Sequence, residues 1–310
     1  MVIKQPSELT CKKHISMLVY GQPGIGKTTL GCSAPQPVLF DFDEGVQRMN
    51  VAHQVPTVQV QSWNDVLEAL NEIKQGAFPC KSIVIDTAGK MLDFMSKDII
   101  DHNPRYAQSD GALTLKGYGA RKQMFVQFVK DVLSSGLNVV FVAHEKEDKQ
   151  GDVIIRRPDM SGSSLGDLMK EIDLVGYMYA DINNRRVISF EPNSSFYAKN
   201  ACSVAGTVEV PVVVKDGEAV GNNAFVSDII KSYVKLQETG ADKRKEYDKL
   251  IDDYASEISA IKDAKSANAV LGKFSKEQHI FNSRLRIGRM LNTKCTELGL
   301  KYDDKTKKYA

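Results

Sequence analysis

The chain has 310 residues, 42% of them hydrophobic, and its 41 Lys and Arg against 39 Asp and Glu give a net charge of +2. The apolar content excludes disorder of the whole chain, and the near-neutral charge excludes a uniformly basic surface. The length suggests about two domains. The charge is uneven, because residues 241–310 carry 16 basic against 11 acidic residues, a net of +5, whereas residues 1–240 carry a net of −3.

Cysteine usage and the lack of long apolar runs indicate the compartment. The five cysteines are scattered without a C-x-x-C pair, which favours a reducing cytoplasm over a disulfide framework or a zinc site. No stretch approaches ~18 consecutive apolar residues, and the N-terminal stretch lacks an apolar signal core. We therefore expect a cytoplasmic protein with no membrane partner.

Apolar runs alternate with helical patterns over most of the chain. Strands are predicted at residues 16–20, 37–42, 81–86, 137–143, 173–180 and 186–190. Helices are predicted at residues 63–76, 89–101, 120–135 and 224–238, and a hairpin at 207–220 around Lys215-Asp216-Gly217. Continuous Val, Ile and Leu strands separated by helices indicate a mostly parallel sheet covered on both faces, so the predicted fold class is α/β.

Beyond Gly240 the pattern changes to helices alone. An apolar stripe from Tyr247 to Ile261 predicts one helix, and a second is expected over about 275–298. We place the domain boundary near residue 240. This gives an α/β core at 1–240 and a basic helical C-terminal module at 241–310.

A glycine-rich segment between the first strand and the next helix carries the sharpest motif, G-x-x-x-x-G-K-[ST]. It consists of Gly21, Gln22, Pro23, Gly24, Ile25, Gly26, Lys27, Thr28 and Thr29. Its glycines allow successive N–H groups to form an anion nest, and the helix N-terminus adds its dipole. We expect Lys27 to reach the β- and γ-phosphates of a nucleotide and Thr28 to bind Mg²⁺. The alternative is a glycine-rich turn without a ligand.

Polar side chains at three further strand ends suit the same chemistry. Asp86 ends the run Ile-Val-Ile and is the candidate Walker B carboxylate for Mg²⁺, the alternative being a helix cap by Asp86 or Thr87. Asp43 or Glu44, after the second strand, is the candidate that orients the attacking water, the alternative being a solvated acidic turn. His144, after the fourth strand, is a candidate γ-phosphate sensor or a structural histidine.

The motifs D-F-D-E-G, I-V-I-D-T-A, V-F-V-A-H-E, L-M-K-E-I-D-L-V and F-Y-A-K-N follow the P-loop in order. Over residues 14–200 this series resembles the phage-encoded RecA-like ATPases of the Sak-type single-strand annealing family. The resemblance implies a RecA-like P-loop core that binds ATP and Mg²⁺, associates with single-stranded DNA and promotes annealing or strand exchange. It matches Asp86 to Walker B and His144 to the sensor position. D-F-D-E-G departs from the commoner D-T-E-G-G, so the catalytic acid stays open between Asp43 and Glu44.

The resemblance also implies assembly into a filament or ring with ATP at subunit interfaces. Arg185, Arg186 and Lys199 are then candidates to reach a neighbour's phosphates as an arginine finger. The alternative for residues 183–186 is a solvated hairpin turn. A single-strand DNA-binding protein is a further candidate partner, and the compartment would be the cytoplasm of a bacterial host.

Two long segments, 101–119 and 145–165, lack strong periodicity and are predicted to be DNA-binding loops, or else mobile surface loops. Tyr106 and Tyr118 could stack on bases there. The tail is a candidate accessory DNA-binding or partner-docking module, or else a solvated face. Its basic residues are Lys273, Lys276, Arg284, Arg286, Arg289 and Lys294.

The leading functional hypothesis is a phage DNA-dependent ATPase that promotes recombination by single-strand annealing. The first alternative is a helicase-related or loader-type ATPase that remodels a replication complex. The second is a nucleotide-gated binding module with little turnover.

Overall fold

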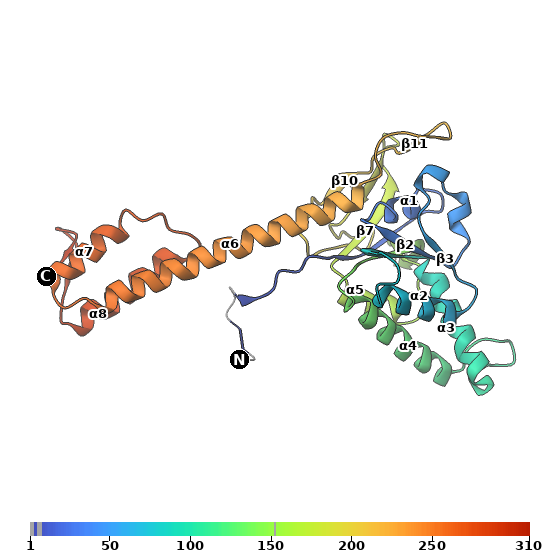
Figure 1. Ribbon diagram of the computed structural model, residues 1–310, viewed down its shortest axis with the longest axis horizontal. Coiled ribbons are helices and arrows are strands. Elements are labelled where there is room, and N and C mark those ends of the chain that lie inside the picture. Colours follow the sequence, from blue (N-terminus) through green and yellow to red (C-terminus); the bar gives the residue numbers. More distant parts are fainter. Residues whose placement is uncertain (1–2, 5–7, 152) are drawn as a thin grey trace. The chain divides into compact units, whose positions relative to one another are not determined.

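The computed structural model, drawn in Figure 1, describes residues 3–4, 8–151 and 153–310. It confirms the predicted α/β class, with a mostly parallel sheet flanked by helices. Contacts divide the chain into two compact units. One unit comprises Lys12–Val234 and holds this sheet, and the other comprises Lys235–Ala310 together with the described residues before Lys12.

The sheet of the first unit has the strand order β10-β8-β7-β1-β5-β4-β2-β3. Its parallel strands are β1 (Ser16–Gly21), β2 (Pro37–Asp41), β3 (Thr57–Gln59), β4 (Ser82–Asp86), β5 (Asn138–Gln150) and β7 (Leu174–Ala180). Antiparallel partners are β6 (Val153–Pro158), β8 (Arg186–Ser189), β9 (Lys199–Asn200) and β10 (Thr207–Glu209). The central strands are buried on both faces, which explains their continuous apolar runs.

Helices cover both faces of the sheet. The helices are α1 (Lys27–Gly31), α2 (Trp63–Lys74), α3 (Ala88–His102), α4 (Leu115–Leu133), α5 (Ser164–Glu171) and α6 (Phe225–Ser259). Helices α2 to α5 pack into the apolar core on one face. Helix α1 and the first turns of α6 pack into the core on the other face.

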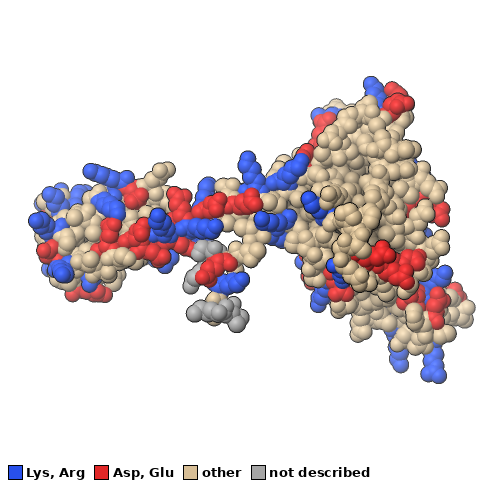
Figure 2. All heavy atoms as spheres, viewed as in Figure 1, with Lys and Arg blue, Asp and Glu red and all other residues tan. Residues whose placement is uncertain are grey.

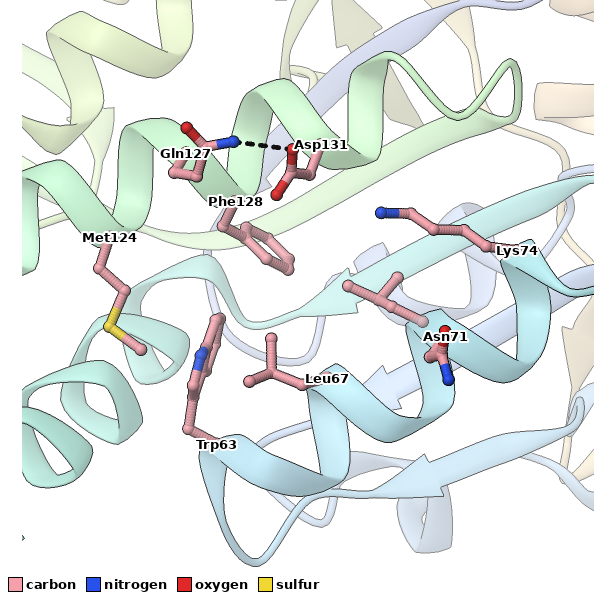
Figure 3. A pocket seen from close by; sticks show the side chains of 9 residues that line it. Trp63, Leu67, Asn71, Lys74, Met124, Gln127, Phe128 and Asp131 are labelled. Carbon is pink, nitrogen blue, oxygen red and sulfur yellow. Dashed lines mark hydrogen bonds between the residues drawn. The ribbon is translucent and has the colours of Figure 1, made fainter.

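Helices α2 and α4 leave an apolar groove of about 370 Å³ between them, shown in Figure 3. Trp63 and Phe128 meet edge to face at its floor, with ring centroids 5.2 Å apart. At the rim, the Gln127 amide donates a 2.8 Å hydrogen bond to Asp131. The Trp63–Phe128 contact joins the two helices, whereas the Gln127–Asp131 hydrogen bond lies within α4.

Strand register brings the predicted site residues to one edge of the sheet. Gly21 at the end of β1 lies opposite His144 of β5, and Asp41 at the end of β2 lies opposite Asp86 of β4. All four strands are parallel, so their carboxyl ends open on the same side. Ligands of open α/β sheets bind at this edge.

The prediction of a loop over 145–165 is wrong. Strand β5 continues to Gln150 and pairs antiparallel with β6, and α5 begins at Ser164. Ion pairs link the two strands, Arg156 to Glu147 at 3.1 Å and Arg157 to Asp148. Cross-strand charge pairs stabilise this hairpin in place of apolar alternation, which is why periodicity did not reveal it.

The connection between α3 and α4 is shorter than the predicted segment 101–119. Helix α3 continues to His102, a 3₁₀ turn spans Pro104–Tyr106, and α4 begins at Leu115 instead of residue 120. Thr114 caps α4 by accepting a hydrogen bond from the Gly117 N–H. The first turns of α4 contain few apolar residues, so the apolar pattern predicted a later start for this helix.

The predicted hairpin at 207–220 is confirmed only at its turn. β11 (Val214–Lys215) pairs with β12 (Glu218–Ala219), and the positive φ angles of Asp216 and Gly217 suit a two-residue turn. Thr207–Glu209 pairs with β8 instead.

The second unit contains most of α6, α7 (Ala264–Phe274), α8 (Ser283–Glu297) and a hairpin of β13 (Tyr302–Asp303) and β14 (Lys308–Tyr309). Its core includes Tyr254, Ile258, Ile287 and Leu291. The sequence predicted one helix over 224–238 and a separate one from Tyr247 to Ile261. The structure instead has a single helix, α6, that continues through Gly240. The predicted helix over 275–298 begins only at Ser283. None of the helices in the described ranges combines the length and apolarity needed to cross a membrane.

Candidate active site

The P-loop is built on two glycines with left-handed backbones, Gly24 at φ 78° and Gly26 at φ 97°. Other residues rarely adopt this region, so the turn depends on glycine. The Lys27 side chain is 5% exposed, and its ammonium donates hydrogen bonds to the carbonyls of Gly21 (2.9 Å) and Gln22 (2.7 Å). Burial lowers the pKa of Lys27, against the opposing effects of Asp86 and Glu145. The loop therefore holds a cation ready for an anionic ligand.

A cavity of about 360 Å³ opens beside this loop at the carboxyl edge of the sheet. It is lined by Pro23, Gly24, Gly26, Lys27, Thr28, Thr29, Asp43, Gly45, Arg48, Met49, Asn50, Asp86, Thr87, His144, Arg186, Val213 and Val214. The cavity thus combines most of the predicted P-loop with one acid from each of two strand ends. It shares no residue with the groove in Figure 3.

Thr28 and Asp86 meet directly, because the Thr28 hydroxyl donates a hydrogen bond to the Asp86 carboxylate. Asp86 is 4% exposed, and burial raises its pKa above the ordinary value, while the Thr28 hydrogen bond acts in the opposite direction. Of the two residues that were candidates for the helix cap, Thr87 is the one that caps α3, accepting from the Lys90 N–H at 3.3 Å. The Asp86 carboxylate is left to face the cavity.

The three acids at the end of β2 and in the turn after it have different surroundings. Asp41 accepts hydrogen bonds from the N–H groups of Asp43, Gly45 and Val46, at 3.2, 2.9 and 2.9 Å, and so builds the turn. Asp43 lines the cavity. Glu44 adopts a left-handed backbone with φ 52° and is not among the lining residues. Of the two candidate acids, Asp43 is therefore the one that lines the cavity.

Arg48 holds Asp43 in place. Its guanidinium lies 3.6 Å from the Asp43 carboxylate and donates a 2.6 Å hydrogen bond to the Asp43 carbonyl. No motif in the sequence marked Arg48, although it lies one 3₁₀ turn beyond the acid.

His144 lines two cavities. It lines the P-loop cavity and also a smaller one of about 240 Å³, which it shares with Thr87, Lys90 and Asp159. Its carbonyl accepts a 2.8 Å hydrogen bond from the Asp159 N–H. Its Nδ1 atom is buried and has no hydrogen-bond partner among the described residues. A buried polar atom without a partner is uncommon and suits a group that contacts a ligand.

The three candidate trans residues are placed differently from one another. Arg186 is half-buried and lines this chain's own cavity, with Nη1 only 3.0 Å from where a Cβ on Gly26 would lie. Arg185 pairs with Asp181 at 2.7 Å across the tight β7–β8 turn, and with Glu209 of β10 at 3.4 Å. The Lys199 ammonium donates to the carbonyls of Met169 and Lys170 at the end of α5. Within one chain, only Arg186 of these three lines the cavity.

The outer wall of the cavity comes from segments that are distant in sequence. Asn50 donates a 2.7 Å hydrogen bond to the Gly217 carbonyl, and a His53 ring nitrogen lies 3.0 Å from the Val213 carbonyl. These contacts bring Val213 and Val214 beside Met49, as an apolar wall next to the phosphate loop. The sequence did not predict this wall, because no local pattern indicates that residues 50–53 contact residues 213–217.

Residues 13–202 match the protein family described as an AAA domain. The chain belongs to this AAA domain family of P-loop ATPases. It is also 22% identical over 167 residues to the SPbeta prophage-derived uncharacterized protein YorG of Bacillus subtilis (strain 168). That match covers 52% of this chain and 49% of the relative, so the chain spans about half the length of the curated relative it matches.

Membership of the AAA domain family implies nucleotide binding, usually with Mg²⁺, and the residues present suit both. The positive-φ glycines and the buried Lys27 form an anion nest. The Thr28 hydroxyl and the Asp86 carboxylate are oxygen donors, as Mg²⁺ prefers, and one or two protein oxygens beside phosphates are its usual ligand set. The unpartnered His144 nitrogen offers a further contact.

Asp86→Asn removes the buried charge and keeps an acceptor for Thr28. Because the folded-state pKa of Asp86 is raised above 3.8, folding favours the protonated carboxyl, so wild-type stability falls as the pH rises through that raised pKa. We expect D86N without nucleotide to lack this slope and to be no less stable at neutral pH. Its affinity for Mg²⁺-nucleotide should fall by about tenfold or more.

Urea unfolding between about pH 4 and pH 8, and nucleotide titration with and without Mg²⁺, measure the two effects. A D86N protein that keeps both the wild-type slope and the wild-type Mg²⁺-nucleotide affinity would contradict the assignment.

Proposed function

We propose that this AAA domain protein is a Mg²⁺-dependent ATPase that binds single-stranded DNA and promotes recombination by single-strand annealing in a phage context. The observation that carries the ATPase assignment is the convergence of Lys27, Asp43, Asp86 and His144 on one cavity. The likeness to a prophage-derived protein supports the phage context. Annealing is inferred from the Sak-type resemblance of residues 14–200.

In this proposal the P-loop binds the triphosphate. The Lys27 ammonium would exchange its present carbonyl partners for phosphate oxygens, which compensates for its desolvation, and the N–H groups of the nest would donate to the same phosphates. Thr28 and Asp86 would hold Mg²⁺, which would supply positive charge to the phosphates. Met49, Val213 and Val214 offer an apolar surface for the base.

Asp43 is the residue we assign to orienting the attacking water. It lines the cavity, and Arg48 fixes its position. His144 would contact the transferred phosphate through its unpartnered Nδ1 atom. Arg186 would place positive charge against the same phosphates from its own chain, since it approaches the Gly26 turn. Arg185 and Lys199 have other partners and are not needed for this step.

The β5–β6 hairpin is the segment we assign to DNA contact. Its pairing begins at Glu145, directly after His144 on the same strand, so a change at the phosphate would reach it through one continuous strand. Arg156 and Arg157 are paired with acids, whereas Lys146 and Lys149 are exposed and have no ion pair among the described residues. These lysines can neutralise DNA phosphates.

Asp43→Asn should lower the ATP turnover rate by about a hundredfold or more, because it removes the carboxylate that orients water. Nucleotide affinity should change little. Glu44→Gln is the matched control, one residue along the same turn but outside the cavity lining, and should stay within about twofold of wild type. Single-turnover hydrolysis measures both. The reverse result, with E44Q inactive and D43N active, would overturn the assignment.

Single-stranded DNA should raise the ATPase rate at low salt, because ATP and DNA stabilise the same ordered state. Lys146→Gln with Lys149→Gln should weaken this stimulation severalfold, since each phosphate contact contributes to affinity. The control pair, Lys97→Gln with Lys130→Gln, removes equal charge from exposed sites on α3 and α4.

ATPase and strand-annealing assays over a range of salt concentrations measure these effects. An ATPase rate that does not change with single-stranded DNA would contradict the proposal. Duplex unwinding without annealing would favour a helicase-related activity instead.

A further inference from the structure

The helical unit carries a groove of its own along α8, with a volume of about 660 Å³. It is lined by Phe274, Phe281, Asn282, Arg284, Leu285, Gly288, Arg289 and Asn292. All of these residues belong to the unit that contains Lys235–Ala310. The groove is therefore a feature of this module alone.

An exposed aromatic ring stands at one end of the groove. Phe281 is 64% exposed and has φ 48°, a left-handed backbone that is uncommon for a bulky residue. Tyr247 fixes this turn, because its ring meets Phe281 edge to face at 5.8 Å and its hydroxyl donates a 2.7 Å hydrogen bond to Asn282. Strained backbone that the surroundings hold in place is typical of functional sites.

The floor of the groove is apolar and shallow. Leu285 is 56% exposed, and Gly288 one turn later leaves room beside Phe274, whose nearest ring atom lies 3.6 Å from where a Cβ would be. A larger residue at 288 would fill this hollow. The groove thus offers flat apolar surface instead of a deep pocket.

The rim of the groove is positively charged and uncompensated. Arg284 and Arg289 are exposed, and neither has an ion pair within the described part of the chain. Three acids of the same unit have other partners, since Asp248 pairs with Arg244, Glu257 with Lys273, and Glu277 accepts from Tyr254. No acid lines the groove. Figure 2 shows Lys and Arg interleaved with Asp and Glu over the visible face of the helical unit.

We propose that this groove binds single-stranded nucleic acid without needing ATP. An exposed ring can stack on a base, the two arginines suit phosphates, and Asn282 and Asn292 can hydrogen-bond base edges. An acidic peptide would use the charge but would not need an open ring face beside amides. The inference rests on the proposed function for the kind of ligand, and it adds a contact that is separate from the ATPase cavity.

Fluorescence anisotropy with labelled oligo(dT), the full chain, and no ATP or Mg²⁺ tests this site. Arg284→Gln with Arg289→Gln should weaken binding roughly tenfold and lower the slope of log affinity against log salt by about 1.4, as two phosphate contacts are lost. Arg286→Gln is the matched control, because Arg286 is exposed on the same helix but does not line the groove. It should change affinity by less than about twofold.

Phe281→Gly should weaken oligo(dT) binding at least about fivefold, because the stacking ring is lost. Glycine also relieves the left-handed backbone, so the fold should persist, which circular dichroism checks. The proposal is overturned if R284Q/R289Q binds like R286Q, if duplex DNA binds as tightly as oligo(dT), or if a Glu- and Phe-rich peptide competes equally well. Failure of ATP-dependent stimulation alone would instead count against the proposed function of the core.

Discussion

Lys27 and Asp86 are opposite charges held almost out of water at one edge of the sheet, with exposed fractions of 5% and 4%. Burial acts against both charges, because it lowers the pKa of the lysine and raises that of the aspartate. Their mutual attraction and their hydrogen bonds offset only part of this cost. A ligand that brings phosphates and a divalent cation would complete both sets of contacts. The need to compensate these two charges is the constraint on which the site depends.

The parallel sheet makes this arrangement possible. Gly21 and Asp86 end the two strands on either side of β5, and His144 lies on β5 opposite Gly21, so the register sets their order along the edge. The same strand that presents His144 continues as the β5–β6 hairpin, so one rigid element joins the nucleotide cavity to an exposed charged surface. In the proposed function, this continuous strand is the route by which hydrolysis would be coupled to DNA contact.

Local chemistry explains which features the sequence could predict. The P-loop and the buried strands were predictable, because glycine geometry and apolar runs act over a few residues. Which of Asp43 and Glu44 lines the cavity was not predictable, since this depends on the backbone of Glu44 and on the hydrogen bonds of Asp41. The β5–β6 hairpin escaped notice because charge pairs stabilise it. The outer wall of the cavity and the placement of Arg186 depend on contacts between distant segments.

In the helical unit, too, local patterns were predictable and features that depend on distant contacts were not. Its apolar stripes predicted helices, but the break at residues 275–282 depends on the left-handed turn at Phe281 and on its anchor, Tyr247. That break exposes the aromatic ring. Part of the basic excess of residues 241–310 lies at Arg284 and Arg289 of α8, which have no ion pair among the residues that the structure describes.

Calorimetric titration of the full chain with Mg²⁺-ATP tests the central claim most directly, by comparing wild type with Lys27→Met and the control Lys90→Gln. The account predicts that K27M, which keeps the buried volume but loses the charge, weakens binding about a hundredfold or more, while the exposed Lys90 site leaves it unchanged. Equal affinity in wild type and K27M, or no binding by wild type, would contradict it.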